Sequence, residues 1–143
     1  MLAAERGTVT GSRGATVIKV KRVYTPLALD DGSRFLVERL WPRGMRKEAL
    51  PLAGWVKAVA PSAALRRWFG HDPQKWEEFQ CRYVTELDGN PEAWRPLLER
   101  ARRDTITLLY SAWDPDHNSA EVLKRYLEAK LPRHGRRSRR AAA

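Results

Sequence analysis

The sequence of 143 residues contains little cysteine and no long apolar run. Its one cysteine, Cys81, excludes an internal disulfide framework and makes a reducing compartment the expected location. No apolar segment approaches the roughly 20 residues that a membrane-spanning helix needs. Residues 1–14 also lack the apolar stretch of a signal peptide. These absences predict a soluble, cytoplasmic protein with no membrane partner.

The net charge of +10 is concentrated at one end of the chain. Five arginines lie within 133–140 and no acidic residue accompanies them, which leaves +5 on residues 1–132. Residues 132–143 are predicted to form a basic, disordered tail, because they have too little apolar surface to offset the entropy of ordering. Such a tail either serves solubility or attracts nucleic acid weakly and in a salt-dependent manner.

The remaining chain has the composition of one folded domain. Hydrophobic residues make up 43%, and six tryptophans favour a definite core. Residues 1–14 show no periodicity and are predicted to be a flexible leader. The sequence therefore predicts a single α/β domain over residues 15–131.

Three segments have the β-branched and apolar character of strands, namely 17–24, 34–41 and 105–110. Between and after them, apolar residues recur at helical spacing. Helices are predicted over 52–59 and after each of four start signals, which are Ser62, Asp72-Pro73, Asn90-Pro91 and Asp114-Pro115. Pro96 is expected to break or kink the helix that follows Asn90-Pro91.

Apolar strands separated by helices predict the α/β class, with a short, mostly parallel sheet of three to four strands and helices packed on its faces. The carboxyl ends of parallel strands share one edge, and ligands bind in the crevice there. We therefore expect a site where segment 39–47, after the second strand, meets segment 111–118, after the third.

Both segments carry side chains suited to an anionic ligand. Arg39 and Arg43 can donate paired hydrogen bonds, and Gly44 would let the backbone approach a ligand closely. Trp41 would form a wall, although a core position is an equal alternative. The expected start of the last helix adds free N–H groups and a favourable dipole. The polar residues there are Ser111, Asp114 and Asn118.

His117 is the candidate catalytic residue, because a histidine can act as an acid or base near neutral pH. The alternative is a surface histidine bonded to a neighbouring acid. Asp114 is more simply a helix cap, and as such it would repel an anion placed at that helix start. No metal-ligand spacing and no serine-nucleophile motif appears, so neither a metal site nor a serine hydrolase is predicted.

Several strings between about residues 16 and 130 resemble a known family, in order and at the expected spacing. They are Val37-Glu38-Arg39-Leu40-Trp41-Pro42-Arg43-Gly44, Ala60-Pro61-Ser62 with Leu65-Arg66, Trp68-Phe69 with His71-Asp72-Pro73, and Leu108-Leu109-Tyr110 with Asp114, His117 and Asn118. The family is the YeaO-like branch of domain-of-unknown-function family 488. The resemblance implies a small three-layer α/β fold, and it implies neither an agreed activity nor a cofactor.

The same resemblance adds Arg66 and His71 to the candidate ligand-binding residues. More distant members of the wider family carry cysteines near the last strand and helix. This chain has Ser111 and His117-Asn118-Ser119 there, so thiol chemistry is not carried over.

The leading hypothesis is a site for an anionic or phosphorylated small molecule, with nucleotide-like compounds among the candidates. The rival is a nucleic-acid-associated binding module that uses the Arg-rich tail. A third possibility is an accessory protein whose tryptophans mark a partner interface.

Overall fold

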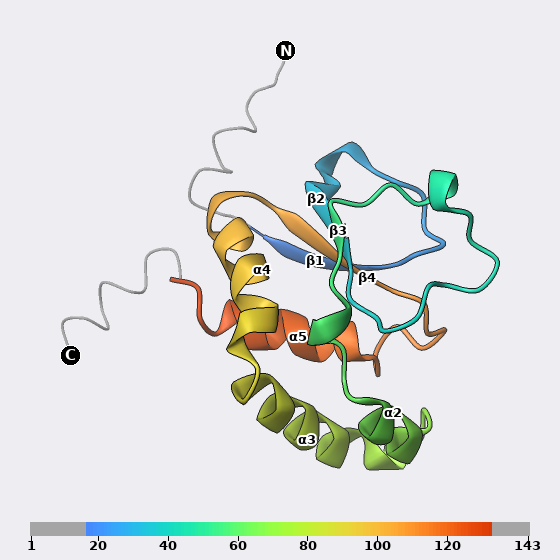
Figure 1. The fold of residues 1–143 in the computed structure, drawn as a ribbon, viewed down its shortest axis with the longest axis vertical. Helices are drawn as coiled ribbons and strands as arrows, with labels where there is room; N and C mark the ends of the chain where they lie inside the picture. The colour runs from blue at the N-terminus through green and yellow to red at the C-terminus, as the bar shows by residue number, and fades with distance from the viewer. Residues whose placement is uncertain (1–16, 133–143) are drawn as a thin grey trace.

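The computed structural model describes residues 17–132, which form a parallel sheet covered by helices (Figure 1). The expected leader at 1–14 and all but the first residue of the expected tail lie outside these residues. The sheet has four strands in the order β1-β4-β2-β3, and all three neighbouring pairs are parallel. The strands are β1 (Ile18–Arg22), β2 (Ser33–Leu36), β3 (Gly54–Trp55) and β4 (Ile106–Tyr110). The expected fold class is confirmed.

The α-helices are α2 (Ala63–Phe69), α3 (Trp76–Asp88), α4 (Pro91–Arg103) and α5 (Ser119–Glu128). Short 3-10 turns are η1 (Leu29–Asp31), η2 (Lys47–Ala49), η3 (Lys57–Val59) and η4 (Pro73–Lys75). The expected cap at Ser62 is confirmed, since its hydroxyl accepts a 3.1 Å hydrogen bond from the backbone N–H of Leu65. Gly70 closes α2 in the left-handed conformation, with a φ of 54°.

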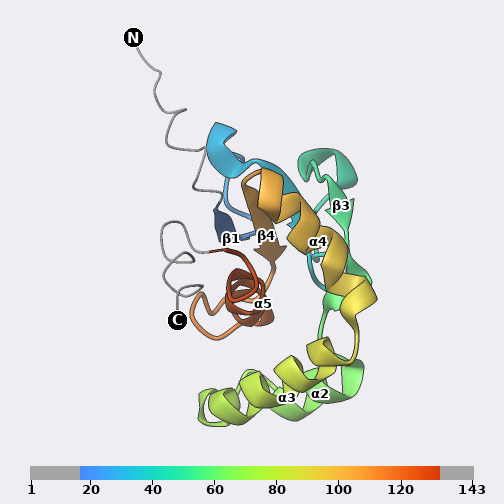
Figure 2. The ribbon, with the colours of Figure 1, turned by 90° about the vertical axis from the view of Figure 1, so that its left-hand side faces the viewer.

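All four of these α-helices bury side chains in one core on one face of the sheet. Strand β4 supplies Ile106, Leu108 and Tyr110 to this core, because alternate residues of a strand point to the same face. Helix α5 lies between the sheet and α3 (Figures 1 and 2).

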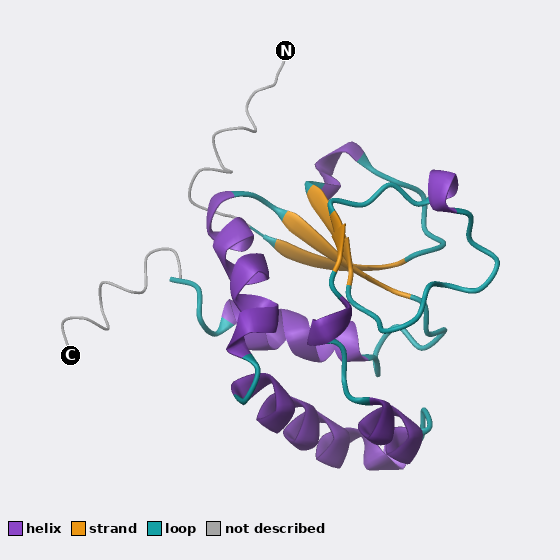
Figure 3. Ribbon diagram, viewed as in Figure 1, coloured by secondary structure: helices purple, strands orange, loops and turns teal. Residues whose placement is uncertain are grey.

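The opposite face carries a second, smaller core built from loops. Leu36 and Leu109 point to this face, and they are covered by Trp55 of β3 and by residues from connecting segments, namely Val23, Trp41, Met45, Leu50 and Leu52. Figure 3 shows the long connection between β2 and β3 beside the sheet. The third layer that the resemblance implied is therefore made of loops and 3-10 turns.

The helix predicted over 52–59 is wrong, because this segment forms β3 followed by η3. The backbone N–H of Ala53 donates to the carbonyl of Arg34 at 2.6 Å, and that of Val56 donates to Leu36 at 2.8 Å. These bonds to β2 satisfy backbone groups that a helix would have paired locally. Gly54 inside the segment also weakens a helix.

The last helix begins at Ser119 and not at Asp114-Pro115. Asn118 is its cap, and the side-chain oxygen of Asn118 accepts from the backbone N–H of Glu121 at 3.0 Å. Asp114 instead closes a separate turn, where it accepts from the backbone N–H of Asp116 at 2.9 Å.

Pro96 does not break α4, which runs through it from Pro91 to Arg103. The proline is the sixth of the 13 residues of the helix and lies on its exposed side. The buried residues Ala93, Leu97 and Ala101 follow helical spacing around it and hold the helix on the core.

Among residues 17–132, none of the helices combines the length and apolar character that a membrane crossing requires.

Candidate functional site

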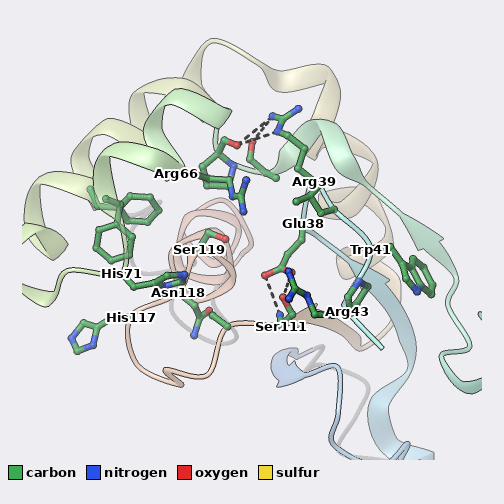
Figure 4. Close-up of a pocket in the computed structure, with 17 residues that line it drawn as sticks. Glu38, Arg39, Trp41, Arg43, Arg66, His71, Ser111, His117, Asn118 and Ser119 are labelled. Atoms are coloured by element: carbon green, nitrogen blue, oxygen red, sulfur yellow. Dashed lines mark hydrogen bonds between the residues drawn. The ribbon is translucent and has the colours of Figure 1, made fainter. Parts of the chain in front are cut away.

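A pocket of about 280 Å³ opens where the carboxyl ends of β2 and β4 meet (Figure 4). The two strands are adjacent, with Phe35 opposite Leu108, and they run parallel as the sequence predicted. The pocket walls come from residues 38–43 after β2, from 111–112 and 117–119 after β4, and from segments around α2. Chain segments far apart in the sequence therefore form one cavity at the expected edge of the sheet.

Eight of the ten residues expected from the sequence line this pocket. They are Arg39, Trp41, Arg43, Arg66, His71, Ser111, His117 and Asn118. Gly44 and Asp114 do not line it.

Gly44 has a conformational role. The backbone N–H of Met45 donates to the carbonyl of Pro42 at 3.3 Å, which closes a turn with Gly44 in its third position. The φ of Gly44 is 74°, a value that glycine adopts without strain and that a type II turn requires there. No atom lies within 4 Å of where a Cβ would stand, so close approach to another group does not explain this glycine.

Arg39 ties the end of β2 to the segment that precedes α2. Its guanidinium donates to the carbonyls of Ala60 and Pro61 over 3.3–3.4 Å, as the dashed lines of Figure 4 mark. These long hydrogen bonds orient Arg39 along the pocket wall, and the side chain is half-buried there.

Trp41 belongs to the second core as well as to the pocket rim. Its indole N–H donates to the carbonyl of Met45 at 2.6 Å, and its ring packs edge-on against Trp55 at 5.3 Å. In Figure 4 the ring points away from the other labelled side chains. This packing is the core alternative that the sequence left open.

Arg43 and Arg66 present positive charge to the pocket from opposite sides (Figure 4). Within residues 17–132, neither guanidinium forms an ion pair with an acidic side chain. The hydroxyl of Tyr24 donates to the carbonyl of Arg43 at 3.1 Å and so fixes the backbone there. Two arginines without acidic partners leave the pocket with capacity for an anion.

His71 holds a strained backbone conformation at the pocket. With a φ of 58°, it is the one residue other than glycine with a positive φ in the described part of the chain. It directly follows Gly70, so two successive left-handed residues turn the chain sharply between α2 and η4. Such a conformation costs on the order of 1 kcal/mol for a side chain larger than glycine. The turn places the imidazole of His71 at the pocket, which it lines.

Glu38 is the site residue that sequence reasoning missed. Both of its carboxylate oxygens accept from Ser111, at 3.0 Å from the backbone N–H and 2.6 Å from the hydroxyl. Its neighbour Arg39 donates to the carbonyls of Ala60 and Pro61 and does not pair with it. Its position directly after a buried strand, at the edge where ligands bind, was the available signal.

His117 is oriented by Asp114, since its Nδ1 lies 2.9 Å from the Asp114 carboxylate. Its ring also meets the edge of Trp76 at 5.0 Å and lies at the outer side of the pocket in Figure 4. The backbone N–H of Asp116 and the His117 ring hold the pKa of Asp114 below its usual value. The Asp114 carboxylate therefore forms its hydrogen bonds within this turn and does not line the pocket.

Asn118 is buried and its amide is engaged at both ends. The nitrogen donates to the carbonyl of Asp114 at 3.0 Å, while the oxygen caps α5. Asn118 therefore shapes the pocket wall by fixing the backbone on both sides of it.

The part of the chain that the structure describes contains no group of three or more His, Cys, Asp or Glu side chains arranged to hold a metal ion.

Comparison with known proteins identifies the family. A family model described as the inactive DUF488-N3 subclade matches residues 17–143. The chain belongs to this subclade of the DUF488 family.

Relatives within the family support the assignment over the whole domain. The chain is 39% identical to the uncharacterized protein YeaO of Escherichia coli (strain K12) over 112 residues, which cover 78% of this chain and 97% of YeaO. It is 36% identical over 115 residues to the uncharacterized protein Rv3073c of Mycobacterium tuberculosis, covering 80% of this chain and 97% of that protein. The YeaO-like resemblance found in the sequence is confirmed. No solved structure matches the chain significantly.

Proposed function

We propose that this DUF488 protein binds a small anionic molecule, such as a phosphorylated compound, in the pocket at the carboxyl ends of β2 and β4. The observation that carries the proposal is the pair of arginines, Arg43 and Arg66, which open into one pocket without acidic partners among the described residues. Guanidinium groups donate paired, charge-assisted hydrogen bonds to phosphate and carboxylate. His71 adds an imidazole to the same cavity.

Binding without turnover is the form of the proposal that agrees best with the family. The subclade is described as inactive. The side chains after β4 are also engaged in structure, because Ser111 donates to Glu38 and Asn118 caps α5. The Ser111 hydroxyl donates its hydrogen bond to a carboxylate, so it could act as a nucleophile only if that carboxylate removed its proton as a base. The description of the subclade as inactive argues against this use.

Acid–base catalysis by His117 is the second candidate. The specific observation in its favour is the contact between Nδ1 and Asp114, which leaves Nε2 as the nitrogen that would exchange a proton with a ligand. The outer position of the ring places it at the rim of the pocket (Figure 4). The two candidates share one ligand site, and they differ in whether a bound phosphate ester is consumed.

The test compares matched arginines on the same elements. Arg66 lines the pocket, whereas its neighbour Arg67 on α2 carries the same charge outside it. Arg43 lines the pocket, whereas Arg46 lies three residues further on and does not. Binding of orthophosphate and of glycerol phosphate is measured by calorimetry at fixed low salt, and by the rise in melting temperature that ligand binding causes.

We expect Arg66→Ala and Arg43→Ala each to weaken binding by about tenfold or more, the size of one charge-assisted hydrogen bond. Arg67→Ala and Arg46→Ala should leave it nearly unchanged. Equal losses in all four variants would indicate a general charge effect and contradict a site in this pocket. Release of phosphate from glycerol phosphate, lost in His117→Ala, would favour the catalytic candidate.

A further inference from the structure

The carboxylate of Glu38 is fixed at the wall of a pocket otherwise rich in cations. Ser111 holds both oxygens, through its backbone N–H at 3.0 Å and its hydroxyl at 2.6 Å. The backbone of Glu38 is fixed as well, since its carbonyl accepts from the indole N–H of Trp55 at 2.7 Å. The Glu38 carboxylate therefore cannot turn out of the pocket without breaking both hydrogen bonds from Ser111.

The negative charge of Glu38 has no basic partner in the described structure. Among residues 17–132, no ion pair joins it to a lysine, arginine or histidine, although Arg39, Arg43 and Arg66 line the same cavity. A carboxylate can accept about four hydrogen bonds, and Ser111 uses two of these positions. Glu38 can therefore accept further hydrogen bonds, and it lines a pocket that a ligand can enter.

A simple anion fits only half of this arrangement. It would be attracted by Arg43 and Arg66 and repelled by Glu38 across a cavity of about 280 Å³. In so small a space the repulsion is screened less than in bulk water. A ligand that also brings a positive or N–H donor group converts that repulsion into a charge-assisted hydrogen bond.

We propose that Glu38 is the specificity-determining residue of this pocket, and that it selects anionic ligands that also carry an ammonium or amino N–H donor. The inference rests on the proposed anion site, because Arg43 and Arg66 would hold the anionic end. Ser111 is the positioning residue that keeps the carboxylate in place. The volume is close to the lower end of small-molecule pockets, about 300–1,000 Å³, which favours a compact ligand.

Two sources of donor meet this requirement, and matched ligand pairs separate them. Phosphoethanolamine carries an ammonium group that ethyl phosphate lacks. Guanosine monophosphate carries a base amino group that inosine monophosphate lacks. Calorimetry on the full chain at fixed low salt measures all four affinities, with orthophosphate as the reference anion.

We expect at least one donor-bearing ligand to bind about tenfold tighter than its matched partner. Preference within the first pair identifies an ammonium ligand, and preference within the second identifies an amino-bearing base. In Glu38→Gln, the preference should disappear while ethyl phosphate binds more tightly, because the repulsive charge is gone. A purely structural role for Glu38 would lower the melting temperature without changing the ratio of affinities.

Equal binding within both pairs overturns this inference while leaving the anion site intact, provided that orthophosphate binds and Arg66→Ala weakens it. Failure of every anion, orthophosphate included, overturns the proposed function and the inference together. Should Glu38→Gln fail to fold, the affinity ratios of the wild-type chain decide, and Ser111→Ala tests the clamp. That variant keeps the charge and should lower the preference without reversing it.

Discussion

Asp114 and His117 are joined by a 2.9 Å hydrogen bond between Oδ2 and Nδ1, within a turn that the same carboxylate closes. The other oxygen, Oδ1, accepts from the backbone N–H groups of Asp116 at 2.9 Å and His117 at 3.2 Å. One ionised side chain therefore sets both the backbone of the turn and the direction of the imidazole. This turn links β4 to α5 and forms one side of the pocket.

Acid should release this turn at a pH below the usual range of an aspartate. The backbone N–H of Asp116 and the His117 ring lower the pKa of Asp114 below its usual value of 3.8. A lowered folded-state pKa contributes stability that is present above pH 3.8 and is lost as the pH falls through the lowered pKa. The measurement is the amide chemical shift of Asp116 during an acid titration. A midpoint at or above 3.8, or an unchanged transition in Asp114→Asn, would contradict the assignment.

Asp31→Asn should destabilise the fold strongly. Asp31 is buried, and its carboxylate pairs with Lys21 at 2.9 Å and with Arg34 at 3.6 Å. Burial would raise the pKa of Asp31, but hydrogen bonds from Lys21 and from the backbone N–H of Ala28 outweigh it, and the pKa is lowered. Loss of this charge leaves the buried Arg34 without an acid, so we expect about 3 kcal/mol of lost stability.

Urea unfolding provides the measurement for Asp31, and the neighbouring Asp30 provides the control. Asp30 also pairs with a lysine, Lys19, but its side chain is 80% exposed. Exposed ion pairs contribute little, so Asp30→Asn should leave the unfolding midpoint nearly unchanged. Similar midpoints for the two variants would show that the buried pair carries no special weight.

Two glycines with positive φ should respond very differently to alanine. At Gly44 an added Cβ meets no atom within 4 Å, so Gly44→Ala should cost only the conformational strain, about 1–2 kcal/mol. At Gly32 the φ is 67° with a ψ of −139°, and an added Cβ would collide with the carbonyl of Thr105, the residue before β4.

Gly32→Ala should therefore cost about 4 kcal/mol or prevent folding, since backbone on both sides must shift. Melting temperatures of the two variants, compared with the parent chain, test this order. A larger loss for Gly44→Ala would mean that the 42–45 turn is packed more tightly than the structure shows.

Removal of residues 133–143 should separate the two binding hypotheses. The segment carries five arginines. If it binds polynucleotides, the logarithm of the association constant should fall linearly with the logarithm of the salt concentration. Each phosphate contact contributes slightly less than one unit to this slope, so the slope should reach at most about four. The shortened chain should lose most of its affinity for polynucleotides and keep its affinity for orthophosphate. Unchanged polynucleotide binding after the deletion would show that residues 133–143 do not carry this binding.

The amino-acid sequence alone was sufficient for the local features of the fold. Start signals such as Ser62 and Asp72-Pro73 act through hydrogen bonds within two or three residues, and the structure has both caps. The strand compositions of 17–24 and 105–110 likewise predicted β1 and β4. Because the strands were expected to be parallel, the edge that holds the pocket was also predictable, together with eight of its 17 lining residues.

Tertiary structure decided the features that depend on distant partners. Segment 52–59 has helical spacing but becomes β3 and η3, because β2 offers it backbone hydrogen bonds. The cap of α5 moved from Asp114 to Asn118, because Asp114 is used by its own turn. Glu38 became a pocket residue through Ser111, 73 positions away in the chain. Local propensity reports only neighbouring residues, whereas the charge pattern of this pocket arises from contacts that exist only once the sheet has formed.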